Sequence, residues 1–113
     1  MVGAAALESA QRELREECGV TAGSWLEIVG MDLSNSVSDE SGVAFLAWDL
    51  SHGSAQPEDN EQLQVIRVPF REAVERVKRS EIRDSLSVAA ILRVALMALQ
   101  GELPEALKGV IRV

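Results

Sequence analysis

Residues 12–20 read Arg-Glu-Leu-Arg-Glu-Glu-Cys-Gly-Val, and this short run constrains both the local structure and the chemistry of the chain. The residues from position 4 to position 18 are rich in alanine, leucine, glutamate and arginine, which have high helix propensities. Gly19 follows at the place where helices commonly end in a left-handed conformation. The sequence therefore predicts a helix from Ala4 to Cys18.

The predicted helix has an apolar stripe and an acidic arc. The apolar stripe, which we expect to be buried, consists of Leu7, Ala10, Leu14 and Cys18. Glu13, Glu16 and Glu17 stand at i, i+3 and i+4 and share an arc roughly 100° away from that stripe. A bound Mg²⁺ or Mn²⁺ would turn the mutual repulsion of these carboxylates into ligation by oxygen donors. The alternative is a solvated charged face, with Arg12 and Arg15 offsetting part of the charge.

The run from Arg12 to Val20 resembles the second half of the Nudix box. The Nudix family consists of pyrophosphohydrolases that cleave nucleoside diphosphates linked to another group. In that half of the box, Arg-Glu, an aliphatic residue, any residue, Glu-Glu, any residue, Gly and an aliphatic residue follow in order, and each fixed position is met here. The resemblance implies that Glu13, Glu16 and Glu17 are metal ligands, with Glu17 also catalytic, and that Arg12 orients the carboxylates.

The resemblance extends over two acidic loops. Asp39 and Glu40, ahead of the apolar run from Val43 to Ala47, are similar to a loop in members that act on ADP-ribose and related nucleotide sugars, which implies a role in substrate binding. Asp59-Asn60-Glu61 is similar to the loop from which those members present a catalytic base. Glu61 is thus the candidate to deprotonate or position the attacking water. The alternative for Glu61 is an exposed loop acid.

Further elements follow from local patterns. Three runs with strand character are Trp25–Leu33, Val43–Leu50 and Gln62–Val68. Pro69 marks the entry to a short helix from Arg71 to about Arg79. A long apolar helix is predicted from Leu86 to Gln100, capped by Asp84 or Ser85, and a short strand at Val110–Val113.

These elements and the resemblance together imply an α/β fold. We expect a single domain over residues 1–113, built as a Nudix-type α/β/α sandwich in which two or three principal helices surround a mixed sheet. The full box carries a further Glu upstream of Arg12, and its spacing places that Glu at position 4, which is Ala4. We therefore expect a chain that begins within the motif and lacks the N-terminal strands of the family.

A Nudix core without its first strands would leave apolar surface exposed. The two candidate surfaces are the run Val43–Ala47 and the helix Leu86–Leu99, in which Arg93 is the only charged residue. A helix so apolar must be buried on several sides or pair with another chain. Because large apolar patches are costly in a monomer, we expect a homodimer or a higher homo-oligomer.

Charge and cysteine content limit the possible partners. Eleven basic and eighteen acidic side chains give a net charge of -7, which disfavours nucleic acid but permits a small nucleotide bridged by divalent cations. Cys18 is the only cysteine, so no intrachain disulfide forms and a reducing compartment is expected. The run Leu86–Leu99 is shorter than the roughly 20 residues that cross a bilayer, and Met1–Leu7 is too short for a signal peptide. We expect a cytoplasmic protein without a membrane partner.

The function that these observations predict is metal-dependent hydrolysis of a nucleoside diphosphate linked to another group. ADP-ribose-like nucleotide sugars are the favoured substrates, and Mg²⁺ or Mn²⁺ is the expected cofactor. The alternative is a non-catalytic Nudix-like dimer that serves as a binding or structural module, or an inactive remnant. Glu13, Glu16, Glu17 and Glu61 favour the enzyme, whereas Ala4 and the missing strands favour the alternative.

Overall fold

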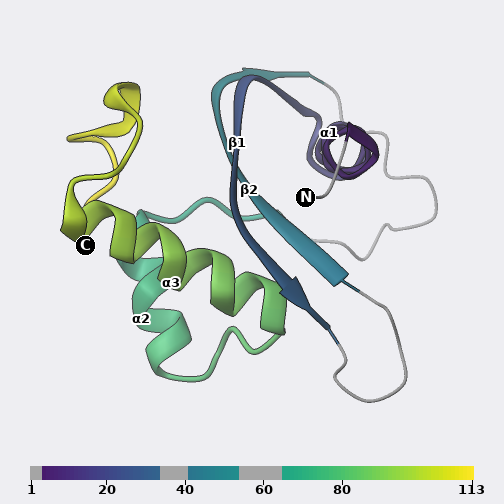
Figure 1. Ribbon diagram of the computed structural model, residues 1–113. Helices are drawn as coiled ribbons and strands as arrows, with labels where there is room; N and C mark the ends of the chain where they lie inside the picture. Colours follow the sequence, from purple (N-terminus) through teal and green to yellow (C-terminus); the bar gives the residue numbers. More distant parts are fainter. Residues whose placement is uncertain (1–3, 34–40, 54–64) are drawn as a thin grey trace. The chain divides into compact units, whose positions relative to one another are not determined.

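The computed structural model describes residues 4–33, 41–53 and 65–113 (Figure 1). Its elements, in chain order, are α1 (Ala4–Cys18), β1 (Val20–Asp32), β2 (Ser41–His52), α2 (Phe70–Lys78), α3 (Ser85–Gln100) and a short 3₁₀ helix, η1 (Glu105–Leu107). The predicted α/β class is confirmed. The chain divides into two compact units, residues 1–26 with 45–67 and residues 27–44 with 68–113.

Strands β1 and β2 pair in an antiparallel, two-stranded sheet (Figure 1). β1 begins at Val20 and not at Trp25, because the strand extends through the small residues Ala22, Gly23 and Ser24, which have low strand propensity. β2 is half-buried along its whole apolar run from Gly42 to Trp48. Partial cover on both faces is what the unbroken apolar sequence predicts.

The first unit combines α1 with the adjoining parts of the hairpin. Trp25 packs edge-on against Phe45, with ring centroids 6.0 Å apart and an interplanar angle of 79°. The indole Nε1 of Trp25 donates a hydrogen bond to the carbonyl oxygen of Ala22 at 3.1 Å. Both the ring and the polar N–H of Trp25 therefore have partners within the protein.

The apolar stripe of α1 is less covered than the sequence predicts. Leu7, Ala10, Leu14 and Cys18 are half-buried, and α1 contains no residue that is fully buried. The helix nonetheless has the predicted bounds. Sequence periodicity identified the side that faces the protein but overestimated how completely that side is covered.

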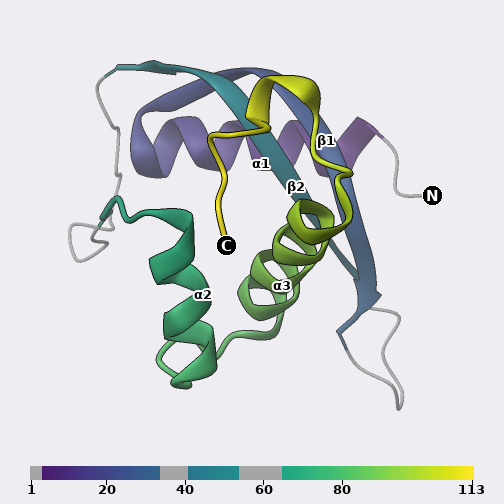
Figure 2. The ribbon, with the colours of Figure 1, turned by 90° about the vertical axis from the view of Figure 1, so that its left-hand side faces the viewer.

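The second unit is built around the two helices α2 and α3, which pack side by side (Figure 2). Its buried apolar side chains are Ile28, Val94, Met97 and Leu103. Asp84 caps α3, because its carboxylate accepts a hydrogen bond from the backbone N–H of Ser87 at 3.0 Å. Gly101 closes the other end with a left-handed φ of 72°. Of the two caps considered from the sequence, Asp84 is the correct one.

One charged side chain links α3 to the sheet within the second unit. Arg93, which is half-buried, donates from Nε to the carbonyl oxygen of Ile28 in β1 at 3.0 Å. Its Nη1 lies 3.8 Å from a carboxylate oxygen of Glu102. The single charge of α3 thus has a structural role, because it satisfies a backbone acceptor on a nearly buried residue.

Two predicted strands differ from the structure. Residues 65–68, the described part of the expected strand Gln62–Val68, adopt no regular structure, and Val65 and Ile66 are 58% and 60% exposed. The tail forms an isolated bridge between Lys108 and Ile111 in place of a strand at Val110–Val113. Both segments have β-branched residues, but such a pattern makes a strand only where a partner strand is available. None of the helices in the described part of the chain combines the length and apolar character needed to cross a membrane.

Candidate functional site

Helix α1, which carries the predicted metal ligands, is fixed at its C-terminal end. Gly19 is buried and adopts a left-handed φ of 68°, and its N–H donates to the carbonyl oxygen of Arg15 at 3.0 Å. The N–H of Gly53, just beyond β2, donates in turn to the carbonyl oxygen of Gly19 at 2.6 Å. A side chain at position 19 would disfavour this backbone conformation. The glycine of the sequence motif therefore anchors the acidic last turn of α1 to the end of β2.

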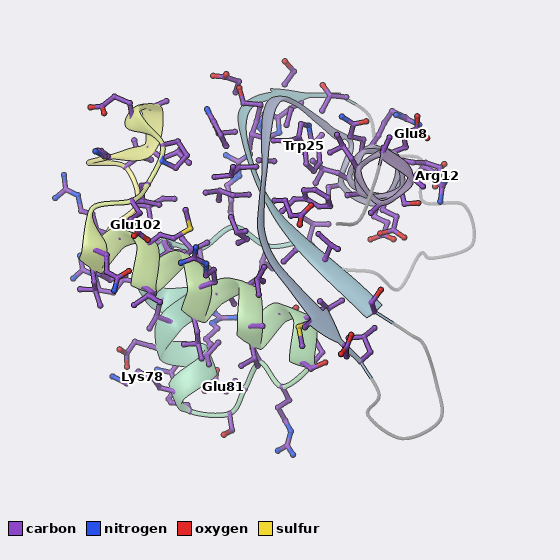
Figure 3. The ribbon with its side chains drawn as sticks, in the orientation of Figure 1. Glu8, Arg12, Trp25, Lys78, Glu81 and Glu102 are labelled. Atoms are coloured by element: carbon purple, nitrogen blue, oxygen red, sulfur yellow. The ribbon has the colours of Figure 1, made fainter. Side chains whose placement is uncertain are left out.

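The acidic side chains of α1 are accessible. Glu13 and Glu17 are exposed and Glu16 is half-exposed, while Arg12 is exposed on the same helix. Glu8 and Arg12 project from the side of α1 that is turned away from the strand segment carrying Trp25 (Figure 3). Among the described residues, no ion pair involves Arg12 or any of the three glutamates. These carboxylates thus remain accessible to a ligand in solution.

The acids of α2 and of the turn that follows it are in a different situation. Arg76 and Arg79 donate hydrogen bonds to Glu72 at 3.1 and 3.2 Å, and Arg79 also donates to Glu81 at 2.7 Å. Hydrogen bonds from Arg76 and then Arg79 lower the pKa of Glu72, and the bond from Arg79 lowers the pKa of Glu81. The two hydrogen bonds that Arg79 donates, first to Glu81 and then to Glu72, raise the pKa of Arg79. The acids of α2 already have cationic partners, which makes α1 the better candidate for a cation-binding helix.

The donor chemistry of α1 fits a hard divalent cation, because Mg²⁺ and Mn²⁺ prefer carboxylate oxygens. The geometry is less complete. In the ranges that the structure describes, no three His, Cys, Asp or Glu side chains lie close enough together to hold a metal ion. The structure therefore places Glu13, Glu16 and Glu17 on one helix but does not gather their carboxylates around one point.

The remaining predicted site residues lie outside the described residues. These are Asp39 and Glu40, expected to contribute to substrate binding, and Glu61, expected to act as the base. Their roles remain predictions from the sequence. The structure thus locates the proposed metal-binding helix but not the groups expected to face it.

Two polar contacts in the first unit were not found from the sequence. The guanidinium of Arg67 lies 2.9 Å from Nε2 and 3.3 Å from Nδ1 of His52, at the end of β2. Asp49 accepts a hydrogen bond from the hydroxyl of Ser24 at 2.9 Å and adopts a left-handed φ of 59° within β2. Gly23 lies opposite, where an added Cβ would stand 3.2 Å from the Cβ of Asp49. The approach of Gly23 to Asp49 depends on the register of the two strands, which the sequence does not give.

Comparisons with known proteins identify similar chains. No family model matches the sequence. The chain is 36% identical over 88 residues to an ADP-ribose pyrophosphatase of Mycobacterium tuberculosis (strain ATCC 25618 / H37Rv), a match that covers 76% of this chain and 42% of that protein. It is also similar to a solved structure described as an ADP compounds hydrolase, with a TM-score of 0.71, 24% identity, and coverage of 85% of this chain and 52% of that one. The chain therefore spans about half the length of these two proteins.

Proposed function

We propose that this chain, which is Nudix-like in both sequence and fold, provides the metal-binding helix for hydrolysis of a nucleoside diphosphate linked to another group. The observation that carries the proposal is the state of the acids on α1. Glu13, Glu16 and Glu17 match the fixed positions of the motif, are accessible, and have no cationic partner among the described residues. Within the described ranges no packing or ion-pair role accounts for them, so a role in binding a cation is the better account.

ADP-ribose is the substrate that we favour. The relative in M. tuberculosis is named for that activity, and the structural neighbour is named for ADP compounds. Both names specify a diphosphate that joins adenosine to a further group. The reaction adds water across the pyrophosphate bond and would release AMP and ribose 5-phosphate from ADP-ribose.

We assign the following roles in the reaction to residues of this chain. Glu13, Glu16 and Glu17 would hold Mg²⁺ or Mn²⁺, which when bound neutralises the pyrophosphate and lowers the pKa of water. Arg12 would keep the carboxylates in a ligating orientation. Glu61 would position or deprotonate the attacking water, and Asp39 and Glu40 would contribute to binding the substrate. Gly19 and Gly53 would hold the acidic turn in place through their backbone hydrogen bond.

A second candidate function is a non-catalytic Nudix-like module. One observation favours it, because Ala4, at the first position of α1, stands where the complete motif has a further Glu. An alanine has no carboxylate, so one acidic position of the complete motif is missing. The two candidates differ in whether the remaining acids suffice for turnover.

Two measurements on the same variants test the proposal. The first is release of AMP from ADP-ribose with Mg²⁺ or Mn²⁺ by the 113-residue chain, and the second is binding of Mn²⁺ alone, followed by electron paramagnetic resonance. Glu17→Gln keeps the size of the side chain and removes its charge, so it should abolish turnover and weaken Mn²⁺ binding at least tenfold. Glu8→Gln, on the same helix but outside the motif, is the matched control and should change neither.

The outcomes separate the candidates. Turnover that Glu17→Gln removes and Glu8→Gln leaves intact supports the hydrolase. Mn²⁺ binding that depends on Glu17 without turnover supports the non-catalytic module. Equal Mn²⁺ binding by the protein and by Glu17→Gln would contradict the assignment of α1 as the metal-binding helix.

A further inference from the structure

An exposed arginine and the single histidine of the chain meet at the end of β2. His52 is the last residue of β2, and Arg67 follows it by fifteen residues along the chain. Nη2 of Arg67 lies 2.9 Å from Nε2 and 3.3 Å from Nδ1 of the imidazole. A position in the ring plane at those distances would clash with the carbon between the two nitrogens, so Nη2 lies out of the plane. The guanidinium is therefore held by the ring without being aligned with a strong acceptor.

Arg67 is an isolated cation in an acidic part of the chain. The first unit, residues 1–26 with 45–67, contains eight acidic side chains, three arginines and no lysine. Arg12 and Arg15 belong to α1, so Arg67 is the one arginine of this unit outside that helix. Among the described residues, no carboxylate lies within ion-pair distance of Arg67. Its charge is thus better explained by an anionic ligand than by the acids of the described structure.

The contact lies beside the acidic end of α1. The backbone N–H of Gly53, the residue after His52, donates to the carbonyl oxygen of Gly19 at 2.6 Å. Gly19 directly follows the last turn of α1, which carries the proposed metal ligands. A cation bound by that turn and the guanidinium of Arg67 would therefore lie in neighbouring parts of one unit. Such an arrangement suits a ligand with more than one phosphoryl group.

The chemistry of the donors indicates the class of ligand. A guanidinium offers N–H groups in a planar fork that matches two oxygens of one phosphate. When water adds across a pyrophosphate bond, its oxygen binds one phosphorus and the bridging oxygen stays on the other. Each phosphoryl group thereby changes from a diester with one negative charge to a monoester with close to two at neutral pH. The species that most needs a cation near the acidic turn is therefore a phosphate monoester.

We propose that Arg67 binds the phosphate group of a phosphate monoester next to the acidic turn of α1, with His52 holding the guanidinium in place. The origin of this ligand rests on the proposed hydrolysis, because the monoester would be one of its two products. The binding itself requires neither metal nor turnover. Arg67 is thus assigned as a binding residue and His52 as a positioning residue.

His52 provides the reporter for a direct test. It is the only histidine, so its ring protons give the only imidazole signals in the NMR spectrum. We expect saturable shifts of these signals on addition of ribose 5-phosphate, AMP or inorganic phosphate at constant pH and without divalent cations. Chloride at the same ionic strength should cause no saturable shift. The ligand that binds most tightly identifies the source of the phosphate, and binding of none of the three would overturn the proposal.

Variants at two arginines locate the binding. Arg67→Gln removes the fork and its charge, and should raise the dissociation constant of the phosphate ligand at least about tenfold. Arg15→Gln removes the same charge from another exposed position of the first unit and is the matched control, with an expected change below about twofold. Circular dichroism shows whether the helices are retained. Arg67→Lys keeps the charge without the fork and should bind more weakly than the unchanged protein.

A kinetic measurement connects the subsite with the proposed reaction. In a chain that releases AMP from ADP-ribose, the product monoesters should inhibit. Arg67→Gln should raise their inhibition constants by about the same factor as the dissociation constants, while kcat changes less.

The outcomes separate this proposal from the hydrolase. Phosphate binding that depends on Arg67 in a chain without turnover supports the subsite and contradicts the hydrolase. Turnover in a chain whose phosphate binding and product inhibition are unchanged by Arg67→Gln overturns the subsite and leaves the hydrolase intact. Equal shifts of the His52 signals in the unchanged protein and in Arg67→Gln would place the anion elsewhere on the chain, and would overturn the subsite as well.

Discussion

Helices α1 and α3 have nearly the same length but differ in what explains their sequences. α1 spans 15 residues, has no fully buried residue and carries four glutamates and two arginines. α3 spans 16 residues, buries Val94 and Met97, and has one charged residue, which bonds to the sheet. The sequence of α3 is explained by packing, capping and one hydrogen bond. The acids of α1 make no comparable contribution to the described structure, which indicates that their role is chemical.

The largest expected effect on stability is in the core of α3. Met97→Ala removes a nearly fully buried side chain and should lower the free energy of unfolding by about 2–5 kcal/mol. Chemical denaturation monitored by circular dichroism measures the change. Leu99→Ala, on the exposed side of the same helix, should cost much less in dilute solution, and equal losses in the two variants would show that α3 has no distinct buried side.

The next largest effect is expected at the link between α3 and β1. Arg93→Met preserves much of the apolar stem but leaves the carbonyl oxygen of Ile28 without its donor, which should cost about 1–3 kcal/mol. Arg112→Met, which removes a local contact to the carbonyl oxygen of Gly109 in the exposed tail, should change stability little. If the two variants unfold at the same denaturant concentration, Arg93 is not a stabilising link.

A smaller effect is expected at the cap of α3, and it depends on pH. Two hydrogen bonds hold the pKa of Asp84 below its ordinary value of 3.8. The larger effect comes from the side chain of Ser87 and the smaller from its backbone N–H. The cap should therefore stabilise the helix fully above about pH 4 and lose its effect as the pH falls through the lower, folded-state pKa. Asp84→Ala should cost about 1 kcal/mol at pH 7.

Asp84→Asn provides the control for this cap. An asparagine can accept the same hydrogen bond but does not titrate, so it should keep most of the stability at pH 7 and remove the acid-dependent part. Thermal unfolding of the three proteins between pH 3 and pH 7 makes the comparison. Parallel pH profiles for the protein and Asp84→Asn would contradict the role assigned to the carboxylate.

The smallest effect on stability is expected on α1, where the effect on activity should be largest. Glu13→Gln and Glu17→Gln should change the free energy of unfolding by no more than about 0.5 kcal/mol, because both side chains are exposed and without ion pairs among the described residues. Removal of one like charge could even stabilise the helix slightly. A loss of 2 kcal/mol or more in either variant would assign the acids a structural role and remove the contrast between α1 and α3.

The helices were more predictable from the sequence than the strands. The bounds of α1 were predicted, and α3 was placed to within one residue, because Gly19, Asp84 and Gly101 stop or start a helix through local backbone geometry. A strand depends on its partner. Val65 and Ile66 have strand propensity but are exposed without regular structure, whereas Ala22, Gly23 and Ser24 have little strand propensity but belong to β1.

The positions of the candidate site residues were predictable from the sequence, but their contacts were not. Positions 13, 16 and 17 follow from helical periodicity and from the motif, and the structure places them on one accessible helix. The accessible state of these acids, and the pairing of those on α2, depends on which arginines fold back onto which helix. The contact of His52 with Arg67 and the left-handed conformation of Asp49 depend on residues distant in sequence, so no local pattern contained them.

The left-handed backbone conformation of Asp49 has a consequence for solubility. A long, straight strand presents a row of backbone N–H and C=O groups along its outer edge, which can template aggregation with the same strand of other molecules. A left-handed residue within β2 interrupts that row, and its carboxylate adds a charge at the interruption. Replacing Asp49 with valine would remove that charge and extend the apolar run of β2, and the protein's tendency to form fibrils at high concentration should rise accordingly.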